Sequence, residues 1–270
     1  MASQLRMGTD YHKQFDPKKY LAMSCSPPAG SEEEKYFRDV HLKELHKVFD
    51  SDILSVGQHS LSTSYLTGVI KPRSRLLDVG TGPTIYQLIS ASRFCTEIVC
   101  AEYAEANRAE VQKWINGDPG AYDWTPSFQY VAELEGDSSS WRARQSHLRN
   151  IIKEVIPCDV TNPDPLTPNK YEQFDVITSM KCLELACSTR ESYSAAVRST
   201  PPGGTLVLIS VISESFHTVG EHKFFTLHVD ETFIEEVLKT AGYIGINIKM
   251  FSALLPKNNE GFWGACSCTC

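Results

Sequence analysis

The chain has 270 residues, of which 41 % are hydrophobic, and its formal net charge at pH 7 is −7. This length is enough to bury a large core, and it fits one α/β domain spanning residues 1–270. The acidic balance comes without any cluster of Lys and Arg interleaved with aromatic residues, so we expect no nucleic-acid partner.

Targeting and membrane signals are missing from the sequence as given. No apolar run approaches the roughly 18 residues of a membrane helix, and residues 1–15 lack the apolar stretch of a signal peptide. The nine cysteines are scattered and odd in number, which is typical of reduced intracellular thiols. We therefore expect a cytoplasmic monomer without a membrane partner.

The cysteines at the end of the chain alternate with other residues. A closed zinc site usually needs four ligands, and this segment offers Cys266, Cys268 and Cys270. A terminal strand is the stronger interpretation, and we predict no metal.

Residues 1–50 are predicted to form an N-terminal arm and helix that act as a lid. Residues 1–30 are polar and interrupted by prolines, which predicts an irregular arm. Ser31 followed by three glutamates has the character of a capping box and opens a helix that runs to about Phe49. Residues 51–74 remain unassigned.

From residue 75 to 270 the pattern is typical of a Rossmann-like, doubly wound α/β core with a mostly parallel sheet. Short apolar runs, which predict buried strands, alternate with longer helical stretches. Two closing strands follow, and an insertion over 117–157 has a loop-like centre and a helical later part. The predicted strands are 75–79, 97–101, 174–178, 205–211, 244–251 and 262–268, and the predicted helices are 84–94, 104–116, 190–199 and 230–241.

A glycine-rich turn follows the first of these strands, in the segment Leu76-Leu-Asp-Val-Gly-Thr-Gly-Pro-Thr-Ile-Tyr86. Glycines there leave room for a ligand to approach the backbone closely. A dinucleotide site would carry a third glycine, which is missing, and an acidic residue precedes the turn. The pattern favours S-adenosylmethionine over a nicotinamide dinucleotide, although a Gly-x-Gly after a strand is also a common tight turn.

Two carboxylates follow later strands. Glu102 ends the next strand, where a Rossmann-like fold places a carboxylate that accepts hydrogen bonds from ribose hydroxyls. Asp159 follows a short apolar stretch, and we interpret it as an adenine contact or, equally, as a helix cap. Glu102 by itself also fits a solvated charge at a helix N-terminus.

Several segments together resemble the nicotinamide, indolethylamine and phenylethanolamine N-methyltransferase family. The resemblance covers nearly the whole chain and implies the class I S-adenosylmethionine-dependent methyltransferase fold, with an antiparallel C-terminal closing strand. The segments that carry it are Lys18-Lys-Tyr-Leu, Gly80-Thr-Gly-Pro-Thr-Ile-Tyr-Gln-Leu, Gly120-Ala-Tyr-Asp-Trp-Thr-Pro, Glu133-Leu-Glu-Gly, Cys158-Asp-Val-Thr, Pro202-Gly-Gly, Val219-Gly-Glu-His-Lys-Phe and Asn258-Asn.

This similarity implies positions around S-adenosyl-L-methionine and around a small amine. Tyr20 and Met180 would lie at the methionine end and the sulfonium, and Asp159 and Val160 would flank the adenine. The amino-acid part of the cofactor would meet Gly80, Thr81, Gly82, Thr84 and Tyr86, the ribose would meet Glu102, Tyr103 and Asn107, and the amine pocket would include Ser210, His217 and Thr226.

Three departures from the family pattern bear on activity. Ser24 and Cys25 stand where the family has a paired tyrosine, and the connection at 198–204 is short. Ser210 stands where the nicotinamide enzyme has a substrate-binding aspartate, which favours an arylalkylamine acceptor over nicotinamide. A catalytically impaired, cofactor-binding pseudoenzyme is the alternative.

Methyl transfer to nitrogen is an in-line displacement that needs alignment and exclusion of water, so we predict no covalent nucleophile. A primary amine must react in its neutral form, and His217 is a candidate to accept its proton because an unperturbed histidine has a pKa of about 6.5. An ordinary polar surface histidine is the competing interpretation. A nicotinamide-dependent oxidoreductase shares the fold but would want the third glycine.

Overall fold

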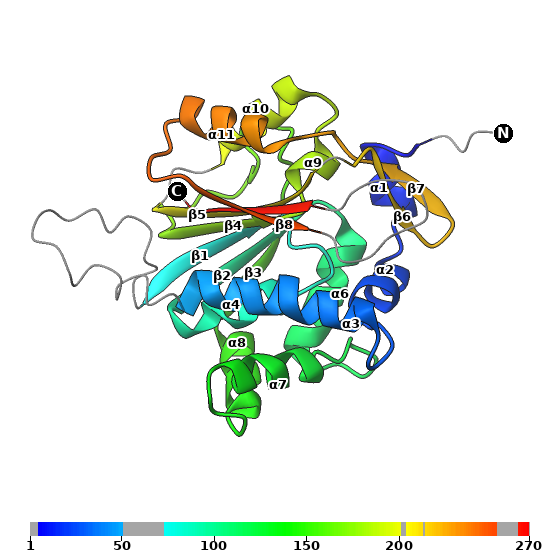
Figure 1. Ribbon diagram of the computed structural model, residues 1–270, viewed down its shortest axis with the longest axis vertical. Helices are drawn as coiled ribbons and strands as arrows, with labels where there is room; N and C mark the ends of the chain where they lie inside the picture. Colours follow the sequence, from blue (N-terminus) through cyan, green and yellow to red (C-terminus); the bar gives the residue numbers. More distant parts are fainter. Residues whose placement is uncertain (1–4, 51–72, 201–203, 213, 253–263, 270) are drawn as a thin grey trace, which may run out of the picture.

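The computed structural model describes residues 5–50, 73–200, 204–212, 214–252 and 264–269. Their centre is a seven-stranded sheet in the order β3-β2-β1-β4-β5-β9-β8, in which the first five strands are parallel and β9 is antiparallel to both of its neighbours, β5 and β8 (Figure 1). This confirms the predicted doubly wound sheet and its antiparallel C-terminal closing strand. The strands are β1 (Ser74–Val79), β2 (Cys95–Glu102), β3 (Ile152–Pro157), β4 (Val176–Met180), β5 (Thr205–Ile212), β8 (Asn247–Ser252) and β9 (Gly264–Thr269).

Helices cover both faces of the sheet because neighbouring strand residues point to opposite faces. Leu76 packs into a core with Trp114 and Phe128, whereas Leu77 packs into a second core with Tyr193. The first face carries α6 (Glu105–Asn116), α7 (Thr125–Leu134) and α8 (Trp141–Ile151), and the second carries α10 (Arg190–Ser199) and α11 (Glu231–Thr240) (Figure 1).

The predicted N-terminal helix is present as α3 (Glu32–Tyr36), the π-helical turn η1 (Phe37–Leu42) and α4 (Lys43–Asp50) in succession. The Ser31 side chain accepts the Glu34 N–H at 3.1 Å, so the predicted cap is confirmed.

The prediction of an irregular arm before that helix was wrong. Residues there form α1 (Thr9–Gln14) and α2 (Pro17–Ser24). Asp16 caps α2 by accepting the Lys18 and Lys19 N–H groups, and Pro17 occupies the first helical position. A proline at that position has no N–H to lose and a pre-set φ, so it starts a helix instead of interrupting one.

Two other segments differ from expectation. The predicted helix over 84–94 is divided into α5 (Tyr86–Ile89) and the short η3 (Ala91–Arg93). The insertion has its turn near Gly136 and its helical later part as predicted, but it also contains α7 and ends in β3, which was missed. Strand β3 lies at the edge and buries Ile152 and Ile156 while its other residues are more exposed, so its apolar pattern is weak.

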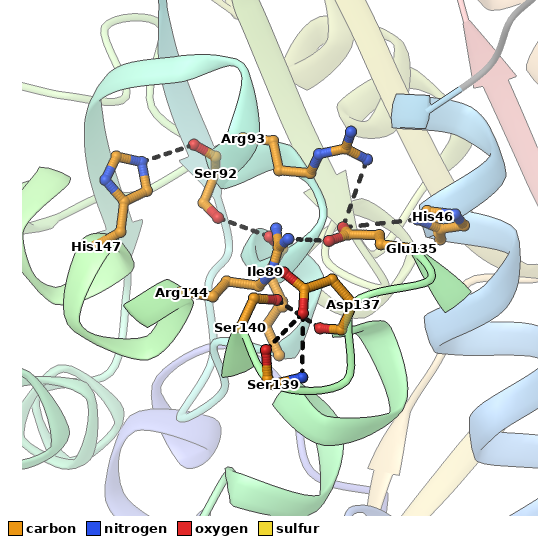
Figure 2. Close-up of polar contacts among 10 residues, drawn as sticks. All are labelled: His46, Ile89, Ser92, Arg93, Glu135, Asp137, Ser139, Ser140, Arg144 and His147. Atoms are coloured by element: carbon orange, nitrogen blue, oxygen red, sulfur yellow. Dashed lines mark hydrogen bonds and ion pairs between the residues drawn. The ribbon is translucent and has the colours of Figure 1, made fainter. Parts of the chain in front are cut away.

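The side chain of Glu135, which follows α7, connects the N-terminal helix to the core (Figure 2). Its side chain is only 5 % exposed and pairs with Arg144 of α8. Its other oxygen lies 3.5 Å from Arg93 Nη1 and 3.9 Å from His46 Nδ1 of α4. One buried carboxylate therefore links α4, η3 and α8.

Several predicted features lie wholly or partly outside the described residues. They are the Asn258-Asn segment, residues 201–203 of the short connection, residues 262–263 of the last predicted strand, Cys270, and residues 1–4 of the predicted lid. Helix α10, which precedes that connection, has the predicted bounds. Across the described ranges, no helix combines the length and apolar character needed to cross a bilayer.

Candidate functional site

A pocket opens at the carboxyl ends of β1, β2 and β4, where parallel strands of such sheets present their ligand sites. It holds about 1060 Å³ of empty space, its open mouth included. Among the predicted cofactor residues, all except Asn107 line it: Tyr20, Gly80, Thr81, Gly82, Thr84, Tyr86, Glu102, Tyr103, Asp159, Val160 and Met180.

The glycine-rich turn forms the floor of this pocket. Gly80 and Gly82 have φ of +74° and +64°, a region that other residues adopt at a cost. A Cβ on Gly80 would lie 2.2 Å from Cys182 Sγ, whereas at Gly82 the nearest atom is 3.9 Å away. Gly80 therefore permits close packing within the protein, and Gly82 leaves its space to a ligand.

A buried carboxylate, Asp78, braces the turn from below. Its oxygens accept the Thr178 hydroxyl at 2.6 Å and the Gln87 amide at 2.9 Å. Gln87 also donates to the carbonyl oxygens of Thr81 and Thr84, so the turn is fixed from its interior. The acidic residue before the turn is thus a positioning group, and Gln87 is one that sequence reasoning missed.

Glu102 ends β2 beside the same turn. Its Oε2 accepts the Gly82 N–H at 2.8 Å. Its Oε1 accepts the Ala104 N–H at 2.8 Å and the Asn107 amide at 3.0 Å. Burial raises the pKa of Glu102, and these donors oppose that shift. Asn107 therefore contacts Glu102 and does not line the pocket. The Glu102 oxygens can still accept hydrogen bonds from hydroxyl groups of a ligand.

Asp159 and Val160 line the pocket from the loop after β3. The Asp159 side chain accepts the Thr161 N–H at 2.9 Å and the Thr161 hydroxyl at 2.6 Å. It shapes a local turn in which Val160 presents an apolar surface. No α-helix begins there, so the structure shows Asp159 as a turn residue and not as a helix cap.

Aromatic side chains close the pocket from the N-terminal arm. Tyr11 stacks on Phe15 with ring centroids 4.4 Å apart, and both line the pocket together with Tyr20. Phe15 also packs at 5.9 Å on Phe224 of a hairpin that sequence reasoning missed, formed by β6 (Phe216–Val219) and β7 (His222–Phe225). Tyr11 and Phe15 were missed because the arm was not predicted to fold.

Of the three predicted acceptor residues, one lines the pocket and two are buried behind it. His217 lines the pocket, and its Nδ1 is 3.4 Å from the Thr226 hydroxyl. Its Nε2 is buried and finds no hydrogen-bond partner among the described residues. Burial, then the charge of Lys181, lowers the pKa of His217 to about 4, so the ring is neutral at pH 7. Ser210 and Thr226 are fully buried behind this surface and do not line it.

Glu184, on the short α9 (Leu183–Ala186), is a buried acid that sequence reasoning did not find. Its Oε1 accepts the Val211 N–H at 2.6 Å, and its Oε2 has no hydrogen-bond partner among the described residues. Burial raises the pKa of Glu184 to about 7, against the Val211 N–H and the charge of Lys181. No sequence motif marks it, because its burial arises from the packing of α9 on β5.

These features fit the chemistry of S-adenosyl-L-methionine. The pocket is lined by both the Asp159 loop and His217, with a ribose-type carboxylate at Glu102 and an open space over Gly82. Its lining is mixed apolar and polar, with aromatic rings over one side.

Comparisons with known proteins point to the same ligand. A sequence model of the NNMT/PNMT/TEMT family matches residues 3–259. The chain is 34 % identical to mouse indolethylamine N-methyltransferase, over 87 % of this chain and 84 % of the relative. It is 32 % identical to human nicotinamide N-methyltransferase, over 94 % of this chain and 92 % of the relative. It is 31 % identical to the phenylethanolamine N-methyltransferase of Macaca mulatta, over 86 % and 79 % respectively.

The fold is shared with a solved methyltransferase structure. Magnesium protoporphyrin IX methyltransferase from Synechocystis PCC 6803, crystallised with SAH, superposes with a TM-score of 0.50 at 12 % identity, covering 97 % of this chain and 96 % of that one. This likeness supports the class I fold. Sequence, fold and pocket therefore agree that the chain belongs to the NNMT/PNMT/TEMT family of S-adenosyl-L-methionine-dependent N-methyltransferases.

Proposed function

We propose that this protein transfers a methyl group from S-adenosyl-L-methionine to the nitrogen of a small amine, with an arylalkylamine as the preferred acceptor class. The observation that carries the proposal is the single pocket that gathers the glycine-rich turn, Glu102, Asp159 and His217 from four separate parts of the chain. When bound, the cofactor supplies an electrophilic methyl group on its sulfonium sulfur.

In this proposal the cofactor is held by residues with distinct tasks. Glu102 accepts the ribose hydroxyls, and Asp159 and Val160 flank the adenine. Tyr20 and Met180 lie at the methionine end. The turn leaves open space over Gly82, and Thr84 and Tyr86 line the pocket beside it.

The acceptor is expected beside His217. His217 lines the pocket and its ring is neutral at pH 7, so a ring nitrogen can accept a hydrogen bond from an amine N–H. Ser210 supplies no charge, and its hydroxyl lies 3.2 Å from the Tyr193 hydroxyl. The position at which the nicotinamide enzyme of the resembling family has an aspartate therefore offers no carboxylate to an acceptor, which favours an arylalkylamine over nicotinamide.

The chemical step mainly requires that the acceptor nitrogen is aligned with the methyl group and that water is excluded. The acceptor nitrogen uses its lone pair to bond the methyl carbon while the carbon–sulfur electron pair returns to sulfur. We propose that residues 1–50 act as a lid, because Tyr11, Phe15 and Tyr20 close the pocket against the β6–β7 hairpin. The product ammonium then loses its proton to solvent.

A catalytically silent cofactor-binding protein is the second candidate. Ser24 and Cys25 stand where the resembling family has a paired tyrosine, and this departure favours a silent protein. Cys25 does not line the cofactor pocket, and the aromatic cover comes from α1 and Tyr20 instead. This arrangement supports a functional lid and makes the enzyme the preferred proposal.

Isothermal titration with S-adenosylhomocysteine, followed by methyl transfer to tryptamine, phenethylamine and nicotinamide, tests both candidates. The enzyme requires binding and turnover, with the arylalkylamines ahead of nicotinamide. Binding without turnover of any acceptor identifies the silent protein. Absence of binding refutes the cofactor site. A Glu102→Ala variant is the matched control, since its heat of binding should be lost.

We also propose that the protein acts as a cytoplasmic monomer on a freely diffusing small molecule. Size-exclusion chromatography with light scattering tests the monomer, and a mass near twice that of the chain contradicts it.

A further inference from the structure

A second cleft lies between the N-terminal helix and α7 (Figure 1). Its described lining residues fall within 25–42 on one side and 122–133 on the other, and none of them lines the cofactor pocket. The family-like segment 120–126 therefore contributes to this cleft and not to the cofactor site. The cleft holds about 1270 Å³ of empty space, its open mouth included, which is enough for a small molecule.

The floor of the cleft is apolar and aromatic. Phe37 and Leu42 of η1 line it and are only 6 % and 2 % exposed. Tyr122 and Tyr130 add two further rings to the lining, and the Tyr122 hydroxyl lies 2.5 Å from the Ser26 hydroxyl. Such a surface suits a ligand with an aromatic body.

The charge of the cleft is negative. Among the described lining residues, the charged side chains are three carboxylates, on Glu34, Asp123 and Glu133, and one guanidinium, on Arg38. Burial raises the pKa of Cys25, which also lines the cleft, to about 12, so its thiol is neutral at pH 7. Negative charge therefore exceeds positive charge here, which favours a cationic ligand.

Arg38 shows how this lining accommodates a cation. Its guanidinium lies over the Tyr130 ring, 4.2 Å from the centroid. Its nitrogens are 3.9 Å from a carboxylate oxygen of Glu34 and 3.9 Å from one of Glu133. The Arg38 side chain is 42 % exposed, and long, exposed ion pairs contribute little to stability. A cation from solution can therefore take the place of this guanidinium at a small cost.

The cleft adjoins the elements that close the cofactor pocket. Cys25 directly follows α2, the helix that carries Tyr20. The Phe37 ring packs edge-on against Tyr86, which lines the cofactor pocket, with ring centroids 5.0 Å apart. An occupant of the cleft would therefore contact residues next to the cofactor site without entering it.

We propose that this cleft is a second ligand site, which binds a small aromatic cation such as the protonated form of an arylalkylamine. The aromatic body lies on the apolar floor, and the cationic nitrogen lies between the Glu34 and Glu133 carboxylates, near the Tyr130 ring. Carboxylates and aromatic faces both attract an organic cation. A protonated amine has no lone pair to accept a methyl group, so a ligand bound here is in its unreactive form. The inference goes beyond the proposed methyl transfer and does not depend on turnover.

Isothermal titration with trimethyl(phenethyl)ammonium tests the inference, because this quaternary cation cannot accept a methyl group. It is titrated into the protein with and without saturating S-adenosylhomocysteine, so that binding in the cofactor pocket is recognised by competition. Phenethyl alcohol, which keeps the ring and lacks the charge, is the ligand control. We expect one cation to bind per chain in both conditions, about tenfold or more tighter than the alcohol.

Two variants with opposite expected effects locate the site. Glu34→Gln/Glu133→Gln removes both carboxylates, while glutamine keeps an oxygen that can accept the Gly30 N–H now bound by Glu34. It should weaken binding of the cation by about tenfold or more. Arg38→Met removes the competing positive charge and should tighten binding by about fivefold or more.

The controls make the same changes in net charge away from the cleft. Glu191→Gln/Glu235→Gln removes two carboxylates from α10 and α11, on the opposite face of the sheet. Lys239→Met removes one positive charge from α11, where Lys239 pairs with Glu235. Distant exposed charges are screened, so the affinity of both controls for the cation should stay within about twofold of wild type.

Three results would overturn the inference. They are no binding of the cation to wild type at millimolar concentration, equal binding to wild type and Glu34→Gln/Glu133→Gln, and unchanged or weaker binding to Arg38→Met. The proposed methyltransferase fails separately, through absence of S-adenosylhomocysteine binding or of turnover. The titrations without S-adenosylhomocysteine still decide the role of the cleft in that case.

Discussion

Glu102 Oε2 accepts the backbone N–H of Gly82 at 2.8 Å, which holds the end of β2 and the turn after β1 as one unit. The Glu102 residue is only 5 % exposed, so solvent screens its charge little and removing that charge should weaken ligand binding. Glu102→Gln places an NH₂ group against N–H donors and should weaken binding of S-adenosylhomocysteine by about 10- to 100-fold, as charge-assisted hydrogen bonds contribute about 1.5–3 kcal/mol. Isothermal titration measures the change, and affinity within twofold of wild type would contradict it.

Gly80 and Gly82 should differ in how much stability an alanine substitution costs. Gly80→Ala combines a positive φ with a Cβ placed 2.2 Å from Cys182 Sγ, so the turn must move. Gly82→Ala has a similar φ but open space around its Cβ. We expect Gly80→Ala to lower the free energy of unfolding by about 2–4 kcal/mol and Gly82→Ala by about 1–2 kcal/mol, measured by urea denaturation. Equal losses of unfolding free energy in the two variants would show that the positive φ, and not the contact with Cys182, sets the cost.

The aromatic lid should control the release of cofactor more than global stability. Phe15 packs on Tyr11 and Phe224 and joins α1 to the hairpin. Phe15→Ala should raise the dissociation rate of S-adenosylhomocysteine by about tenfold or more, with a smaller effect on Tm because a peripheral element opens locally. Stopped-flow fluorescence measures the rate. Lys13→Ala, an exposed position on α1, is the control and should change neither quantity.

The Glu135 cluster should contribute to stability away from the pocket. Removing the negative charge leaves the Arg144 guanidinium, 13 % exposed, without its ion pair (Figure 2). Glu135→Gln should lower the free energy of unfolding by about 2–4 kcal/mol. Glu133→Gln, in which the acid is 56 % exposed and 3.9 Å from Arg38, should cost less than about 1 kcal/mol. Chemical denaturation of both variants checks this difference, which vanishes if the cluster is energetically neutral.

The buried Glu184 predicts a specific pH dependence of stability. Its pKa is raised from the model-peptide value of 4.5 to about 7, so the folded state binds more protons than the unfolded state between these pH values. Its contribution to stability is then fully present below pH 4.5 and is lost as the pH rises through 7. Glu184→Gln should gain stability relative to wild type across this window, by up to about 3 kcal/mol.

Denaturation curves from pH 5 to pH 8 measure this gain. The matched control is Glu191→Gln, because the pKa of Glu191 is lowered and the residue is exposed on α10. A parallel pH profile for wild type and Glu184→Gln would show that the carboxyl is not destabilised by burial.

The elements that depend on local pattern could be predicted from the amino-acid sequence. Apolar runs of strand length separated by helical stretches predicted the parallel core, and the glycine-rich turn with Glu102 at the following strand end predicted where the pocket forms. Chain order was sufficient because the carboxyl ends of parallel strands meet at one edge of the sheet. The helix cap at Ser31 could be predicted for the same reason, because it joins Ser31 to Glu34, only three residues further along the chain.

Features that arise where distant segments meet could not be predicted from the sequence and are visible in the folded protein. Tyr11 and Phe15 became lid residues because α1 packs on the hairpin, and the isolated sequence of a six-residue helix carries little signal. Glu184 and the contact of Lys181 with His41 depend on burial between α9, β5 and η1, across 140 residues for the latter pair. Burial and long-range proximity set the charge state of such groups, and neither property is encoded in local periodicity.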